Sequence, residues 1–77
     1  MNKFVIKVNR KKLYLCSSFE FNGTIIPVFD DELDLALIFD KKEGEKLVNK
    51  LSKNFNNLIL QQINDWQYVK HFDTLDL

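Results

Sequence analysis

Apolar and polar residues alternate through the first third of this chain, and the alternation predicts a sheet built from its N-terminal part. In Phe4–Val8 the odd and even positions fall on opposite sides of a pleat, and β-branched and aromatic residues are enriched, as in a strand. The four polar residues 9–12 interrupt the pattern before Leu13–Cys16 resumes it. We therefore expect the two runs to form a hairpin with a basic tip.

A second pair of short runs follows. Ser17-Ser18 breaks the alternation, Phe19–Phe21 restores it, and Asn22-Gly23 is a turn pair whose residues tolerate positive φ. Thr24–Ile26 fits a returning strand. Pro27 lacks the amide that a central strand donates, so we expect this piece to be an edge strand or an ordered loop.

The middle of the chain carries helical spacing. Asp40 is a suitable N-cap, and Glu43 stands three residues later, as in a capping box. The pattern predicts a helix that runs to about Lys53, with one face formed by Gly44, Leu47, Val48, Leu51 and Phe55. Glycine inside a helix costs up to about 1 kcal/mol relative to alanine, which predicts close packing at Gly44.

An acidic segment precedes this helix. Asp30 could serve as a second N-cap, the acids after it suit the first turn of a helix, and Leu33, Ala36 and Leu37 follow at helical spacing. We expect a short helix of one or two turns. Its acidic residues are Asp30, Asp31, Glu32 and Asp34.

The last third allows two interpretations. Leu58–Ile63 fits a strand that completes the sheet beside the first strand. Asn64-Asp65 could then be a tight turn before a final strand, Trp66–Phe72; alternatively, 58–72 is one helix, since Ile59, Ile63, Trp66 and Val69 approximate helical spacing. With 77 residues, the chain (1–77) is one domain. The predicted fold class is α+β: a small antiparallel sheet packed against one principal helix, with a short acidic helix at its side.

Composition narrows the function without naming it. Eleven basic and eleven acidic residues cancel, so no net field attracts nucleic acid or anionic lipid. Cys16 is the one cysteine, which excludes an internal disulfide and fits a small buried apolar residue. Apolar and polar residues alternate at the N-terminus, whereas a signal peptide has a continuous apolar run there. No apolar run in the sequence is long enough for a membrane-spanning helix. These features predict a soluble, cytoplasmic protein.

The sequence has few side chains of the kinds that enzymes use as nucleophiles or bases. His71 is the one histidine, nothing in the sequence pairs it with Cys16, and two glycines cannot form a glycine-rich phosphate loop. The acidic segment lacks the spacing of a calcium loop, and zinc would need more Cys and His ligands. We therefore predict no catalytic residues, no metal and no cofactor.

Two basic features indicate an anionic partner as one alternative. The first hairpin tip carries consecutive cations, and Lys42, Lys46, Lys50 and Lys53 follow one edge of the predicted helix, where like charges repel one another. A nucleic-acid or nucleotide binder would use Arg10, Lys11, Lys12, Lys46 and Lys50. Arg10 is its one arginine, fewer than proteins that read base edges usually have.

The aromatic residues are more numerous than one small core needs: Phe19, Phe21, Trp66, Tyr68 and Phe72. Any that stay exposed would anchor a protein interface, because aromatic residues concentrate at interface hot spots. Trp66 and Tyr68 are the anchors that we predict.

The order Phe4–Lys7, Leu13–Leu15, Pro27–Asp31 and Ala36–Glu43 resembles small accessory proteins of phages and prophages of low-GC Gram-positive bacteria. In that group a hairpin precedes an acidic turn and a capped helix, often with alanine where this chain has Gly44. The resemblance implies no catalytic residue. It implies stoichiometric binding to a host protein, as in inhibitors of defence systems such as CRISPR nucleases, with the acidic residues meeting a basic nucleic-acid channel. A third hypothesis is a homo-oligomeric structural protein, such as a homodimer, that pairs through the Thr24–Val28 edge.

Overall fold

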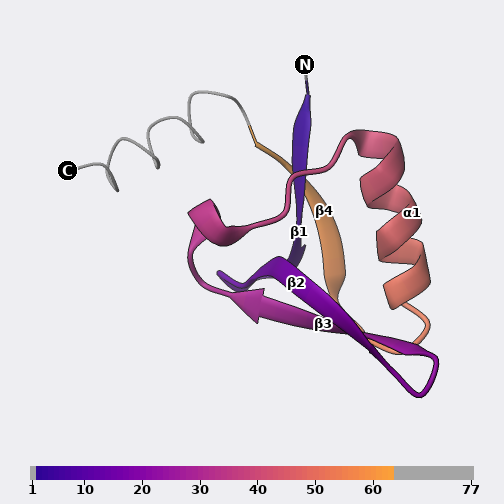
Figure 1. Cartoon of the computed structure of the whole chain (residues 1–77). Coiled ribbons are helices and arrows are strands. Elements are labelled where there is room, and N and C mark those ends of the chain that lie inside the picture. Colours follow the sequence, from indigo (N-terminus) through magenta and orange to yellow (C-terminus); the bar gives the residue numbers. More distant parts are fainter. Residues whose placement is uncertain (1, 64–77) are drawn as a thin grey trace.

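The computed structural model describes residues 2–63 and shows a four-stranded antiparallel sheet with one α-helix (Figure 1). The predicted α+β class is confirmed. The elements are β1 (Lys3–Val8), β2 (Tyr14–Phe21), β3 (Thr24–Asp30), the 3-10 turn η1 (Leu33–Leu35), α1 (Lys41–Leu51) and β4 (Leu58–Ile63).

The strand order is β3-β2-β1-β4, so the N-terminal strand lies inside the sheet. β1 and β4 pair along six residues, from Lys3 opposite Ile63 to Val8 opposite Leu58, which confirms the strand predicted there. β1 and β2 form the predicted hairpin but pair only where Lys7 faces Tyr14. Phe39 takes the place of β2 beside the first half of β1, because the amide of Phe4 donates to the Phe39 carbonyl at 2.9 Å and that of Phe39 donates back at 2.8 Å.

Helix α1 begins where the sequence predicts. The Asp40 carboxylate accepts the backbone N–H of Glu43 at 2.7 Å, which satisfies one of the free donors of the first turn. The helix ends at Leu51, two residues before Lys53, and Phe55 lies beyond it. Gly44 and Leu51 are buried and Leu47 and Val48 are half-buried, so the predicted apolar face is the one that packs.

The core lies on both sides of β1. Toward α1, Ile6, Leu15 and Leu51 form one buried cluster, and on the other side Val5, Ala36 and Ile63 form a second. Alternation along β1 sends neighbouring residues to opposite sides, which is why Val5 and Ile6 are both fully buried. Figure 1 accordingly shows α1 and η1 on opposite sides of β1.

Helix α1 packs closely against β4 at Gly44. A Cβ there would collide with Leu60 Cδ1 and lie 3.2 Å from Leu60 Cδ2, so the missing side chain makes room for β4. The close packing predicted from this glycine is confirmed.

One prediction about the second hairpin was incomplete, and the other is confirmed. Ser17-Ser18 does not end a strand, since β2 continues to Phe21 and contains a bulge between Leu15 and Ser17. Pro27 lies within β3, which is an edge strand of the described sheet, as one of the two alternatives held.

The predicted acidic helix is present as a single turn, within the one or two turns expected, but its cap is not Asp30. The helical residues are Leu33–Leu35, a 3-10 turn, and Glu32 occupies its N-cap position without a capping hydrogen bond from its side chain. Asp30 ends β3, where its carboxylate accepts the backbone N–H of Glu32 at 2.9 Å. A short Asx-type turn therefore uses the carboxylate that a helix cap would have used.

The predicted strand Trp66–Phe72 lies outside the described residues. The alternative of one helix over 58–72 is wrong for its first part, because Leu58–Ile63 is the strand β4. Within residues 2–63, no helix has both the length and the apolar character that crossing a bilayer would need.

Candidate functional site

The hairpin of β2 and β3 has one face that packs and one that does not. Ile25 and Phe29 join the cluster beneath α1, so the alternate residues of β3 point away from the helix. Opposite them on β2 the pairs are Ser17 with Val28, Phe19 with Ile26, and Phe21 with Thr24. We call these six residues the hairpin strip; it contains no charged side chain.

Three large apolar residues of the hairpin strip are open to solvent. Phe21 is 63% exposed, Phe19 54% and Val28 38%, and Ile26 between them is half-buried. Isolated exposed apolar residues are ordinary, but adjacent ones on two paired strands form a patch of the kind that marks an interaction surface.

The β2 bulge is the reason that Phe19 and Phe21 face outward. Leu15 has the same odd parity as both phenylalanines, and it is buried toward α1. Without the extra residue Cys16, regular alternation would send all three side chains to the helix side. The Cys16 thiol donates to the Val28 carbonyl at 3.4 Å and so joins the bulge to β3.

The tip of this hairpin is a tight two-residue turn. Asn22 has a φ of 51° and Gly23 a φ of 79°, as a type I′ turn requires at both central positions. The tip also lies beside the C-terminal end of α1, because Gly23–Ile25 line a hollow together with Lys50 and Leu51 of the helix and with Lys53 and Asn54 just after it.

At its other end the hairpin strip leads into the acidic residues predicted as a binding surface. Asp30 follows Val28 on the same face of β3 and pairs with Tyr14. Asp31 and Glu32 are exposed, and Asp30 and Asp34 are half-buried. We call these four residues the acidic turn. Apolar and acidic surfaces therefore adjoin on one side of the molecule.

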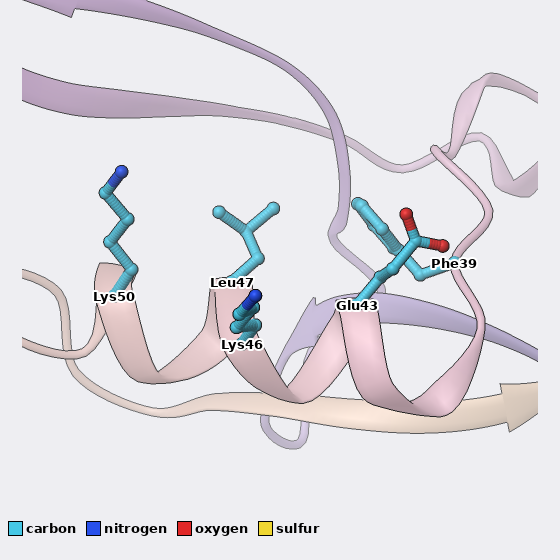
Figure 2. A pocket seen from close by; sticks show the side chains of 5 residues that line it. All are labelled: Phe39, Glu43, Lys46, Leu47 and Lys50. Atoms are coloured by element: carbon cyan, nitrogen blue, oxygen red, sulfur yellow. The ribbon is translucent and has the colours of Figure 1, made fainter.

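A separate hollow lies along α1. It has a volume of about 390 Å³ and is lined by Phe39, Glu43, Lys46, Leu47 and Lys50. Figure 2 shows Glu43, Leu47 and Lys50 projecting from α1 to a common side, with the Phe39 ring beside the first of them. We call it the helix hollow. Phe39 and Leu47 are its apolar residues, and Lys46 and Lys50 are its cations.

The predicted basic residues do not form one surface around this hollow. Lys46 and Lys50 line it, whereas Arg10, Lys11 and Lys12 are exposed in the turn between β1 and β2 and are not among its lining residues. Arg10 adopts a φ of 65°, which the tight turn imposes.

Within residues 2–63, His, Cys, Asp and Glu nowhere gather in a group of three or more that could hold a metal ion. Asp40 has a pKa below its ordinary value of 3.8, chiefly because the backbone N–H of Glu43 stabilises its charged form. This carboxylate is a helix cap, and His71 lies outside the described residues.

The predicted anchors Trp66 and Tyr68 also lie outside the described residues. Phe19 and Phe21, two of the surplus aromatic residues, are the exposed ones that the structure places on a patch. Val28 and the hollow-lining Phe39 and Leu47 had no such signal, because each looks like an ordinary core residue in the sequence.

Comparison with known proteins adds no assignment: no protein-family model, no curated protein and no solved structure matches this chain.

Proposed function

We propose that this protein acts by stoichiometric binding to another protein, with the hairpin strip as its apolar anchor and the acidic turn as its charged border. The observation that carries the proposal is the continuous, uncharged and solvent-exposed row of Phe19, Phe21 and Val28 on paired strands. Exposed aromatic residues surrounded by polar ones are typical of interface hot spots.

The hairpin strip alone is too small for a stable interface. From their exposed fractions, Phe19, Phe21 and Val28 present on the order of 300 Å². A stable interface needs about 800 Å² on each side, so two strips facing each other would fall short. The additional area must come from neighbouring surface, and the acidic turn is the surface that adjoins.

That border defines the chemistry of the partner. A surface complementary to both parts has an apolar patch next to basic residues, because opposite potentials attract across an interface and steer the encounter. Nucleic-acid-binding channels are lined by Lys and Arg and have this character. Together with the resemblance to phage accessory proteins, this supports inhibition of a host nucleic-acid enzyme, such as a defence nuclease.

Affinity capture from a lysate of a low-GC Gram-positive bacterium, with mass spectrometry of the captured proteins, tests the proposal. We expect the wild type to retain a nucleic-acid-binding protein and both Phe19→Ser/Phe21→Ser and Asp31→Lys/Glu32→Lys to lose it. Glu20→Lys/Glu45→Lys reverses two exposed acids elsewhere and should retain it. Equal capture by all four proteins would refute the assignment of the surface.

Titration into the purified partner then tests inhibition. The partner's cleavage or binding of DNA should reach its minimum at one molar equivalent of the wild-type protein. The Phe19→Ser/Phe21→Ser variant should leave the partner's activity unchanged. An alternative outcome is direct binding of an oligonucleotide by the protein alone, weakening steeply with salt and abolished by Arg10→Gln/Lys11→Gln/Lys12→Gln. That result would replace protein binding with the nucleic-acid hypothesis.

A further inference from the structure

The helix hollow differs from the hairpin strip in both charge and place. Its lining comes from α1 and the residue before the helix cap, whereas the hairpin strip points away from α1. Lys46 and Lys50 stand one helical turn apart, close enough for both ammonium groups to reach a single short segment. Leu47 and Phe39 are the apolar residues of the hollow.

These cations are not used internally. In the part of the chain that the structure describes, no carboxylate pairs with Lys46 or Lys50, although Glu43 lines the same hollow. Like charges at this spacing also repel, so the pair does not stabilise the helix. The hollow is therefore positive at its Lys50 end and negative at its Glu43 end, roughly 10 Å apart along the helix.

We propose that the helix hollow binds an acidic peptide segment of a partner protein, with one large apolar side chain on Leu47 and Phe39 and carboxylates on Lys46 and Lys50. Two lysines outnumber the single carboxylate of Glu43, so the hollow carries a net positive charge that favours an anionic occupant. The apolar residues favour a carboxylate-bearing segment with apolar side chains over a nucleic-acid backbone. A small-molecule site would enclose most of its ligand, but this hollow is open along one helix (Figure 2).

A peptide of alternating aspartate and leucine is the probe, titrated into the isotope-labelled protein and followed by NMR. We expect the backbone amides of Phe39, Lys46, Leu47 and Lys50 to shift, and the affinity to fall with added salt. Lys46→Gln/Lys50→Gln should weaken binding about fivefold, since two exposed ion pairs are lost. Lys41→Gln/Lys42→Gln removes equal charge from exposed positions outside the hollow and should bind as the wild type does.

Three outcomes would overturn the proposal. The first is equal affinity in both lysine variants, and the second is equal binding of a lysine–leucine peptide. The third is displacement of the same amides by oligothymidine but not by the aspartate–leucine peptide, which would show a phosphate site. The Phe19→Ser/Phe21→Ser variant should bind the acidic peptide normally, so failure here leaves the proposed function of the hairpin strip unaffected.

Discussion

Gly44 allows a quantitative test of how α1 packs on β4. Replacing glycine by alanine inside a helix ordinarily stabilises it by about 1 kcal/mol. Here the new Cβ would collide with Leu60 Cδ1 and lie 3.2 Å from Cδ2 and 3.4 Å from Cγ. Moving Leu60 from its rotamer and repacking around it costs about 1–3 kcal/mol. We therefore expect Gly44→Ala to destabilise the protein by about 1 kcal/mol net.

The sign should reverse once the colliding atoms are removed. Leu60→Val deletes both Cδ atoms and by itself costs about 1 kcal/mol. In that background Gly44→Ala should stabilise by about 1 kcal/mol, which gives a coupling energy near 2 kcal/mol between the two positions. Urea unfolding of the four proteins, followed by far-UV circular dichroism with an unchanged m value, measures it.

Asn49→Ala is the matched control, because Asn49 is exposed on the same helix. It should stabilise both backgrounds equally, through helix propensity alone. A gain of about 1 kcal/mol from Gly44→Ala in the wild type, or the same change in both backgrounds, would refute the packing argument.

Three further results are expected. Gly23→Ala should cost about 1–2 kcal/mol in urea unfolding despite the open space around it, because Gly23 has a φ of 79°. Asp40 has a pKa lowered by the Glu43 amide, so its contribution to stability is present above the ordinary pKa and lost as pH falls through the lowered one. Asp40→Asn should therefore flatten the acid limb of a stability profile below about pH 4. Pro27→Ala should lower stability by about 0.4–1 kcal/mol through the unfolded chain and raise self-association measured by light scattering.

The structural predictions that are confirmed rest on short-range sequence patterns. The Asp40 cap, the spacing of Leu47, Val48 and Leu51, and the glycine at 44 each act within or against one helix, so the sequence alone predicts the start and the buried face of α1. The strand β4 was also predictable from the sequence, because its apolar run has the length of one strand. Such elements depend on few distant contacts.

The features that the sequence did not predict depend on contacts between distant parts of the chain or on local backbone irregularities. The side to which Phe19 and Phe21 point is decided by one unpaired residue at the β2 bulge, and no residue type announces a bulge. Asp30 looked like a helix cap because a carboxylate before acids suits both a cap and a turn. Lys46 and Lys50 were predicted as binding residues, but the hollow between them needs Phe39, whose place is fixed by pairing with Phe4 across 35 positions of sequence.

The two outer strands of the described sheet are unequal. The tight Asn22-Gly23 turn makes Phe21 and Thr24 a hydrogen-bonded pair of the β2–β3 ladder. Because hydrogen-bonded and non-hydrogen-bonded pairs alternate, the backbone of Pro27 faces away from β2. Its missing N–H therefore leaves the β2–β3 ladder intact but interrupts the outer edge of β3. β4 has neither proline nor charge between Leu58 and Ile63. Within residues 2–63, the β4 edge therefore lacks the interruption that Pro27 makes in the β3 edge, and β3 is the outer strand less suited to pairing with a further strand.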